Sequence, residues 1–237
     1  MPQTVLITGG SRGIGAACVR AFAAAGWNVA FTYRESRALS GALAEETGAL
    51  PLCADLQDSR AAARAVSEAQ RHFGALDAVI CNAGIAQQKM FQDITDADWQ
   101  QMLDVNLLGA VRTIRTALPE LLHRKRGSIV TISSMWGQTG ASCESHYAAS
   151  KAALIGLTKS LALELGPSGI RVNCVAPGVI GTDMNAVHSA QTMQELAEET
   201  PLGRIGTADE VAAAVLFLCS EQASFVTGQV LGVTGGF

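Results

Sequence analysis

The sequence is poor in charged, proline and aromatic residues. Of its 237 residues, 16% are charged, 6 are prolines and 5% are aromatic, while 49% are hydrophobic. Soluble domains average about 25% charged residues, and a chain with so little charge and so much hydrophobic content is not intrinsically disordered. The sequence also lacks a basic excess, since 17 Lys and Arg stand against 21 Asp and Glu. This balance argues against a nucleic-acid-binding protein.

Long apolar runs and paired cysteines are missing too. The longest apolar run, residues 211–219, is nine residues long, whereas a membrane-spanning helix needs ~18. The first residues show no basic stretch followed by an apolar one, so we expect no secretory signal, no membrane partner and a cytoplasmic protein. The 6 cysteines are scattered without a CxxC pair, which predicts free thiols, with neither disulfides nor a metal site.

What the sequence does have is an alternation of short β-branched runs with longer Ala- and Leu-rich segments. Most of the runs are continuously apolar, as in strands that are buried on both faces of a parallel sheet. The alternation predicts one α/β domain over residues 1–237, a Rossmann-type doubly wound parallel sheet of about seven strands with helices on both faces. Strands are expected at residues 4–8, 28–33, 49–54, 78–81, 128–133, 171–175 and 229–233. Helices are expected at residues 14–25, 37–47, 59–73, 97–122, 145–165 and 208–220.

Two stretches depart from this alternation. Pro119 lies late in the fourth expected helix and should kink or end it. Residues 179–201 form no strand–helix unit and contain an amphipathic stretch near residues 187–199. In an open α/β sheet, a segment that follows the carboxyl end of a strand lies over the ligand crevice. We therefore expect a small lid after the sixth strand, at about residues 184–200.

The first expected strand runs into a glycine-rich loop, and a helix follows. The loop reads Thr8-Gly9-Gly10-Ser11-Arg12-Gly13-Ile14-Gly15. Glycines let the backbone approach a pyrophosphate, and the free N–H groups at the helix start bind its charge. A plain strand–helix turn would look similar, but this context favours dinucleotide binding. The residues expected to contact the cofactor here are Gly9, Ser11, Arg12, Gly13, Ile14 and Gly15.

The end of the second strand, Tyr33-Arg34-Glu35, bears on the choice between NAD and NADP. An acidic residue there would hold the ribose 2′-hydroxyl, and a basic one would bind the 2′-phosphate. Arg34, together with Arg12 in the loop, favours NADPH through guanidinium–phosphate contacts. Glu35 is the competing interpretation, and each arginine alone could be an ordinary surface charge.

Tyr147 and Lys151 are candidate catalytic residues. They are four residues apart on an expected helix, so they project from one face. A free phenol has a pKa of ~10, and a neighbouring ammonium lowers it. Tyr147 would then donate a proton to a carbonyl oxygen as a hydride reaches the carbon, and Ser134 would hydrogen-bond the same oxygen. Without the other motifs, Tyr147 and Lys151 would indicate only two neighbouring residues on the surface of a helix.

Together these motifs resemble those of the short-chain dehydrogenase/reductase family over essentially the whole chain. The resemblance rests on the glycine-rich loop, Asn82-Ala83-Gly84, Asn106, Ser134, Tyr147 with Lys151, and Pro177-Gly178. It implies that Asn106 holds a water linking Lys151 to solvent, that Lys151 contacts the nicotinamide ribose, and that the protein is a homotetramer or homodimer. Cys81 stands where the family often has another Asn, and we expect it in the core. The further NADPH contacts that the resemblance implies are Tyr33, Asp55, Leu56, Asn82, Ala83, Gly84, Pro177, Gly178, Ile180 and Thr182.

The end of the chain, from Thr200-Pro201 to Gly235-Gly236-Phe237, is similar to 3-oxoacyl-thioester reductases. The likeness implies reduction of a 3-ketone on an acyl carrier protein by NADPH. Basic residues near the entrance would suit such an acidic carrier, although they would equally stabilise the end of a helix. The candidates are Arg112, Arg115, Arg124, Lys125 and Arg126.

The loop between Ser134 and Tyr147 indicates a different substrate. Its residues Trp136, Cys143 and Glu144 are expected to line the substrate pocket. With Ala86-Gln87-Gln88, the loop is similar to bacterial reductases of a 5-aminopentanone group on elongation factor P. Glu144 would pair with the ammonium of that substrate, or it would simply stabilise the first turn of the next helix, where we also place His146. A non-catalytic NADP-binding sensor or scaffold of this architecture would lack the catalytic Tyr or Lys, whereas Asn106, Ser134, Tyr147 and Lys151 are all present.

Overall fold

Seven parallel strands form one sheet in the structure, a computed structural model that describes residues 2–185 and 189–237. Their order across the sheet is β3-β2-β1-β4-β5-β6-β7. The strands in the described residues are β1 (Thr4–Ile7), β2 (Asn28–Tyr33), β3 (Leu50–Cys53), β4 (Ala78–Cys81), β5 (Gly127–Ile132), β6 (Ile170–Pro177) and β7 (Val230–Val233). The doubly wound sheet that the sequence predicts is confirmed. The order of the strands reverses between β1 and β4, and ligands bind at such a switch point in open α/β sheets.

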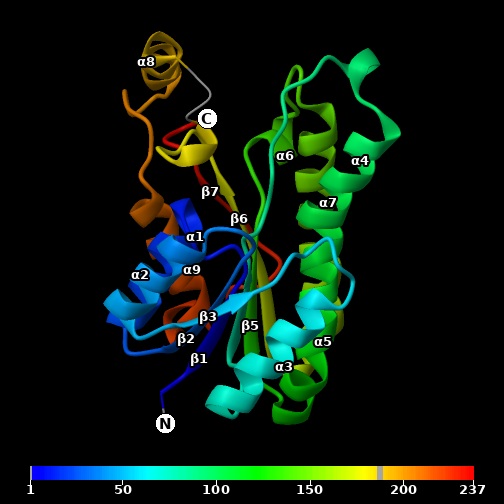
Figure 1. The fold of residues 1–237 in the computed structure, drawn as a ribbon, viewed down its shortest axis with the longest axis vertical. Helices are drawn as coiled ribbons and strands as arrows, with labels where there is room; N and C mark the ends of the chain where they lie inside the picture. The colour runs from blue at the N-terminus through cyan, green and yellow to red at the C-terminus, as the bar shows by residue number, and fades with distance from the viewer. Residues whose placement is uncertain (1, 186–188) are drawn as a thin grey trace.

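Helices cover both faces of the sheet. In Figure 1, α1, α2 and α9 lie against one face, and α3, α5 and α7 lie against the other. The α-helices of the described residues are α1 (Gly13–Ala24), α2 (Arg37–Thr47), α3 (Ala61–Phe73), α4 (Asp96–Leu103), α5 (Gly109–Arg124), α6 (Trp136–Thr139), α7 (Ser145–Leu165), α8 (Ala190–Glu199) and α9 (Ala208–Cys219). Short 3-10 turns occur at Phe91–Asp93, Gly166–Ser168, Asp183–Asn185 and Glu221–Ala223.

The sheet separates two hydrophobic cores. Side chains alternate along each strand, so Leu6 of β1 packs in the core beneath α3, α5 and α7, while Val5 and Ile7 pack in the core beneath α1 and α9. Cys81 joins the first of these cores, as expected, and burial raises its pKa to about 12. Because both faces are covered, the strands need continuous apolar runs, which is the pattern that revealed them in the sequence.

The fourth expected helix is interrupted and is also longer than predicted. It consists of α4, a π-helical turn over Asp104–Leu108, and α5. Of the two outcomes expected at Pro119, a kink or an end of the helix, the end is wrong, because α5 continues to Arg124. Proline removes one backbone hydrogen bond, but Ala117 and Leu121 on either side of it are fully buried against the core and hold the helix across the gap.

The segment after β6 carries the 3-10 turn Asp183–Asn185 and α8, which stands away from the sheet at one end of the molecule (Figure 1). The side chain of Ser189 caps α8 by accepting a hydrogen bond from the backbone N–H of Thr192. Residues 186–188 of the expected lid lie outside the described residues. Across the described part of the chain, every helix is too short or too polar to cross a membrane.

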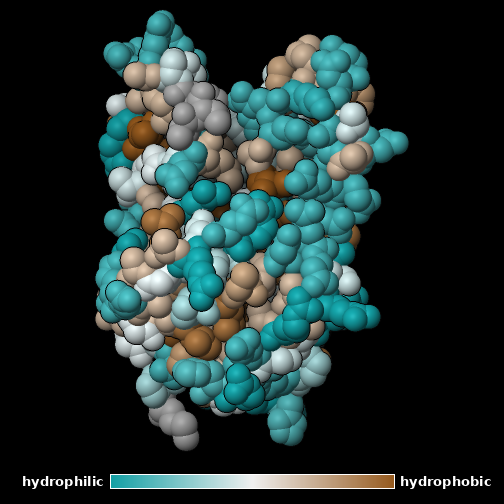
Figure 2. Space-filling model, viewed as in Figure 1, coloured by the Kyte–Doolittle hydropathy of each residue, from teal (hydrophilic) through white to brown (hydrophobic). Residues whose placement is uncertain are grey.

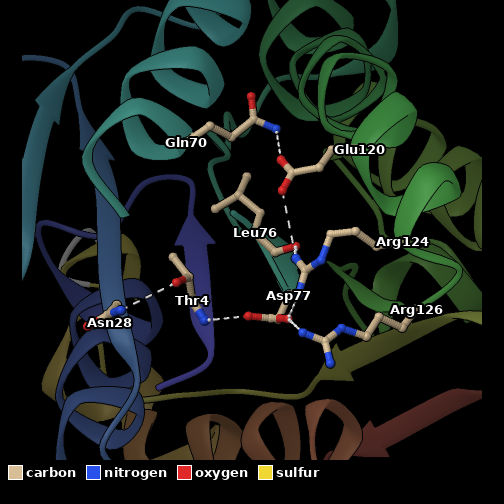
Figure 3. Close-up of polar contacts among 8 residues, drawn as sticks. All are labelled: Thr4, Asn28, Gln70, Leu76, Asp77, Glu120, Arg124 and Arg126. Carbon is tan, nitrogen blue, oxygen red and sulfur yellow. Dashed lines mark hydrogen bonds and ion pairs between the residues drawn. The ribbon is translucent and has the colours of Figure 1, made fainter. Parts of the chain in front are cut away.

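A partly buried ionic clamp holds the other end of the sheet (Figure 3). Asp77, just before β4, accepts a hydrogen bond from the backbone N–H of Thr4 at 2.9 Å and another from Arg124 at 2.6 Å. Arg124 also donates to the carbonyl oxygen of Leu76 at 2.8 Å, and Arg126 lies 3.4 Å from Asp77. These two arginines therefore do not border the ligand end of the sheet. The interpretation of Arg124 and Arg126 as carrier contacts is corrected: they serve the clamp.

Candidate active site

A cleft of about 1070 Å³ opens at the carboxyl ends of the strands. Figure 2 shows it as a notch between two projecting arms, one containing α8 and the other containing α4 and α6. Asn106 and Cys143 are the predicted site residues that do not line it. The predicted residues that do line it are Gly9, Ser11, Arg12, Gly13, Ile14, Gly15, Tyr33, Arg34, Asp55, Leu56, Asn82, Ala83, Gly84, Ser134, Trp136, Glu144, Tyr147, Lys151, Pro177, Gly178, Ile180 and Thr182.

The glycine-rich loop is tightly folded against the segment that follows β4. The Asn82 side chain donates hydrogen bonds to the carbonyl oxygens of Thr8 and Gly9, both at 3.0 Å. A Cβ atom on Gly15 would lie 2.0 Å from the Gly9 oxygen, and Gly9 has a φ of 67°. Only glycine fits at both positions. At the start of α1, Arg12 makes no side-chain capping bond, so the first N–H groups of the helix face the cleft uncapped and suit the pyrophosphate of a dinucleotide.

Arg34 and Glu35, the two residues that bear on cofactor choice, form an ion pair with each other. Arg34 Nε lies 2.9 Å from Glu35 Oε1, and both side chains are largely exposed. Exposed pairs of this kind are weak, so a phosphate entering the cleft can compete for Arg34. Asp55 and Leu56 lie nearby at the end of β3, and Asp55 accepts a hydrogen bond from the backbone N–H of Gln57 at 3.0 Å.

Three predicted catalytic side chains meet where β5 ends and α7 begins. Ser134, Tyr147 and Lys151 are all buried, with exposed fractions of 7%, 7% and 4%. The Lys151 ammonium lies 5.7 Å from the centre of the Tyr147 ring and donates a hydrogen bond to the carbonyl oxygen of Ile132 at 2.9 Å. The phenol, the hydroxyl and the ammonium therefore share one side of the cleft.

The structure reverses one electrostatic prediction about this group. Burial raises the pKa of Tyr147 to about 12; a hydrogen bond from Ser134 partly opposes this rise, and the Glu144 charge adds to it. Burial also lowers the pKa of Lys151 to about 8. The expectation of a lowered pKa for Tyr147 is thus wrong in this structure, because desolvation disfavours the charged form of both groups and outweighs the attraction between them. At neutral pH Tyr147 is a neutral phenol that retains a proton to donate.

Asn106 lies behind this group, on the π-helical turn. Its amide oxygen accepts a hydrogen bond from the backbone N–H of Ile85 at 2.8 Å, and its amide nitrogen donates to the Ile85 carbonyl oxygen and to Ser150 Oγ, each at 3.0 Å. A Cβ on Gly84 would lie 3.2 Å from Lys151 Nζ, so Asn106 holds the chain close beside the ammonium. The expected water between Asn106 and Lys151 stays a prediction.

Two of the three predicted substrate residues lie in the cleft, and the third does not. Trp136 and Glu144 line it. The prediction that Cys143 lines it is wrong: this residue has a left-handed φ of 60°, and its thiol lies against Met90, 3.4 Å from the sulfur. Glu144 occupies the N-cap position of α7 but makes no side-chain capping bond; it accepts a hydrogen bond from Gln88 at 3.3 Å instead.

Sequence reasoning missed part of the lining. Some of these residues follow strand ends, a position that already predicts ligand contact. Others belong to α8 and to the 3-10 turn before it, within the expected lid or directly before it. They include Thr32, Val105, Ile132, Met135, Val179, Asp183, Met184, Asn185, Thr192 and Leu196.

Burial of Lys151 makes a prediction about stability that is independent of any ligand. Its pKa falls from 10.5 to about 8 on folding, so between these values the unfolded chain binds a proton that the folded chain lacks. Stability must then rise with pH in this window. We expect the difference in free energy of unfolding, wild type minus Lys151→Met, to increase by about 2 kcal/mol from pH 8 to pH 10. Urea denaturation at each pH measures this difference.

Lys159 offers the matched control, because it lies two turns further along α7 with an exposed side chain. Lys159→Met should show no such pH-dependent difference from the wild type. A constant difference between wild type and Lys151→Met over this range would contradict the burial of a charged lysine.

Comparison with known proteins places these features in context. A family model described as Enoyl-(Acyl carrier protein) reductase matches residues 9–237. The chain is 38% identical over 243 residues to the "uncharacterized oxidoreductase YmfI" of Bacillus subtilis, covering 100% of this chain and 99% of that protein. It is 41% identical over 236 residues to the 3-oxoacyl-[acyl-carrier-protein] reductase FabG of Aquifex aeolicus, covering 98% and 95% of the two chains. A blue fluorescent protein from a metagenomic library, solved in complex with NADPH, superposes with a TM-score of 0.93 at 34% identity, covering 99% of this chain and 97% of that one.

Proposed function

The chain belongs to the short-chain dehydrogenase/reductase family, and from that premise we propose that it is an NADPH-dependent reductase of 3-oxoacyl thioesters. The observation that carries the proposal is one continuous cleft, lined by the glycine-rich loop and by Ser134, Tyr147 and Lys151. The Aquifex reductase supports the substrate class, and the structural neighbour that holds NADPH supports the cofactor. A thioester of this class would be carried on a protein partner.

The reaction needs a hydride at the carbonyl carbon and a proton at its oxygen. Bound NADPH supplies the hydride. Tyr147 supplies the proton, since burial keeps it neutral at pH 7. The Ser134 hydroxyl donates a hydrogen bond to the same oxygen and stabilises the charge that develops there. Lys151 then stabilises the phenolate left on Tyr147 through its ammonium charge, and the product is a secondary alcohol.

The direct test is NADPH oxidation at neutral pH with acetoacetyl-CoA, with NADH measured alongside. Turnover that is faster with NADPH supports the proposal. If NADPH binds tightly but neither acetoacetyl-CoA nor an acetoacetyl carrier protein is reduced, the thioester assignment is wrong.

The cofactor assignment makes its own prediction. Arg34→Ala should raise the Kd for NADPH by about 10- to 100-fold, because a charge-assisted contact with the 2′-phosphate is lost. The Kd for NADH should change little. Fluorescence titration of the reduced cofactors measures both values.

Glu35→Ala is the matched control, since Glu35 is the ion-pair partner of Arg34. We expect this variant to bind NADPH at least as tightly as the wild type, because Arg34 is released. An equal loss of both cofactors in Arg34→Ala, or a loss of NADH binding in Glu35→Ala, would favour a ribose contact by Glu35 and NAD as the cofactor.

Glu144 favours a second candidate substrate, a ketone that carries an ammonium group. This carboxylate lines the cleft, and it takes part in none of the ion pairs among the described residues. Helix α8 borders the same end of the cleft through Thr192 and Leu196, and its charged residues are all acidic. The 5-aminopentanone group on elongation factor P has this chemistry. Reduction of that modified protein, with acetoacetyl-CoA left unreduced, would decide for the second candidate.

We further propose that the protein assembles as a homodimer or homotetramer. Leu163 on α7 and Phe225 are 83% and 102% exposed in the single chain. Large apolar side chains at such exposure suit an interface between copies. Sedimentation of the purified protein would test this.

A further inference from the structure

Residues 85–89 form one wall of the cleft, near Glu144. Several residues of this segment are hydrogen-bonded to other parts of the chain. Asn106 holds Ile85 through both of its backbone polar groups. Glu144 accepts a hydrogen bond from the side chain of Gln88, and the backbone N–H of Lys89 donates to the carbonyl oxygen of Cys143 at 2.7 Å. The side chain of Gln87, between these points, also lines the cleft.

Gln87 is held from both ends of its amide group. Its nitrogen lies 3.2 Å from Asp98 Oδ1, and its oxygen lies 2.9 Å from His146 Nε2. Asp98 is also bound to Lys89 at 2.7 Å and to Thr95, contacts that lower its pKa. The ionised carboxylate accepts hydrogen bonds and donates none, which fixes the orientation of the Gln87 amide.

That orientation determines the tautomer of His146. The Gln87 oxygen is an acceptor, so His146 must donate from Nε2. The remaining ring nitrogen, Nδ1, carries a lone pair, is fully buried and has no hydrogen-bond partner in the described structure. Trp99 of α4 packs edge-on against the ring, with centroids 5.8 Å apart. The imidazole is thereby locked between α4 and the segment 85–89, one residue before Tyr147.

We propose that His146 is a positioning residue for substrate binding: its neutral, Nε2-protonated ring fixes Gln87 in the wall of the cleft. His146 does not touch the cleft itself and acts through Gln87. The inference rests on the proposed function, because it assigns specificity to the same site. It goes beyond the first-turn position that the sequence suggested for this histidine.

The surroundings of His146 keep its ring neutral at physiological pH. Burial lowers its pKa below 6.5, and the Lys89 charge acts in the same direction, while the Asp98 and Glu144 charges oppose them. Protonation would place an N–H at Nδ1, where no acceptor is available, in a buried site. Acidification through this pKa should therefore disturb Gln87 and raise KM, with kcat less affected.

The first experiment compares His146→Leu, His146→Gln and Gln87→Leu in the full-length enzyme, with acetoacetyl-CoA and saturating NADPH at pH 7.5. His146→Leu removes the donor, so KM should rise about tenfold while kcat stays within about twofold. His146→Gln places an amide donor near the same point and should restore most of the wild-type KM. The double variant His146→Leu/Gln87→Leu should be no worse than the poorer single variant, because both act through one contact.

Additive effects in the double variant, or a loss confined to kcat, would overturn the proposal. If KM stays unchanged in His146→Leu, the positioning role is also wrong. Thermal unfolding of His146→Leu, and the recovery of KM in His146→Gln, distinguish a specific effect on KM from a loss of folding.

A second measurement does not depend on turnover, so it separates this inference from the proposed function. In ¹⁵N NMR of the intact protein, the His146 ring should show the Nε2-protonated tautomer at pH 7 and should titrate below 6.5. Its signals should shift in Gln87→Leu. A charged ring, or an Nδ1-protonated ring, at pH 7 would contradict the proposal even if acetoacetyl-CoA proves not to be a substrate. If acetoacetyl-CoA fails while the NMR result holds, the proposed thioester substrate is wrong and the positioning of Gln87 stands.

Discussion

Replacing Tyr147 by phenylalanine is expected to lower kcat by about 10³-fold, while the affinity for NADPH stays within about twofold. The phenol oxygen is the one atom removed, and it is the proposed proton donor to the ketone. The ring stays in its buried position, where a phenylalanine fits without a new cavity. The variant should also unfold at a similar or higher temperature, because it no longer buries a polar hydroxyl.

The result is read by single-turnover NADPH oxidation together with cofactor titration on the same preparation. Ser134→Ala should cost less than Tyr147→Phe, since it removes a hydrogen bond to the oxygen and leaves the proton donor in place. Turnover of Tyr147→Phe at the wild-type rate would mean that another group supplies the proton. Loss of NADPH binding in parallel would mean that the variant damages the cleft as a whole.

The second large effect is expected far from the cleft, at the clamp of Figure 3. Asp77→Ala should lower the free energy of unfolding by about 2–3 kcal/mol. The change leaves Arg124, whose side chain is 19% exposed, without its carboxylate partner. It also leaves the backbone N–H of Thr4 without its carboxylate acceptor. Glu120, which contacts both Arg124 and Gln70, offers only partial compensation because its distance to Arg124 is 3.7 Å.

The exposed pair between Arg20 and Glu46 is the natural control. Its distance of 2.7 Å is close to the 2.6 Å between Arg124 and Asp77, but both of its side chains are about half exposed. Glu46→Ala should therefore change stability little, because water and salt screen the exposed pair. Urea denaturation of both variants at neutral pH makes the comparison. Equal effects would show that burial does not distinguish the two pairs, and kcat should be unaffected in either.

Local patterns in the sequence predicted the sheet, the glycine-rich loop and the Tyr147–Lys151 pair. Each of these follows from a short-range rule. A continuous apolar run indicates a strand buried on both faces, and a four-residue spacing places two side chains on one helix face. Glycine indicates a position where two backbone segments come close together. The resemblance to a known family then supplied roles that no local pattern contains, such as that of Asn106.

The misplaced residues are those whose surroundings come from distant parts of the chain. The charge of Asp77, 47 residues before Arg124, determines what that arginine does. Cys143 does not line the cleft and has a left-handed backbone, which composition does not reveal for a residue other than glycine. The direction of the pKa shift of Tyr147 depends on how completely the fold buries it. A sequence lists the neighbours of a residue along the chain, and desolvation is set by its neighbours in space.

The geometry of the active site depends on the number of residues in the π-helical turn over Asp104–Leu108, as well as on the side chains present. Such a turn is a regular helix with one residue inserted, and each residue advances an α-helix by about 100°. Without the insertion, α4 would be rotated by that angle relative to α5. Asn106 would then lose its alignment with Ile85, and Trp99 would lose its alignment with His146. The contact with Ile85 and the contact with His146 thus both depend on a single extra residue in the helix. A comparison of side chains alone would overlook this dependence.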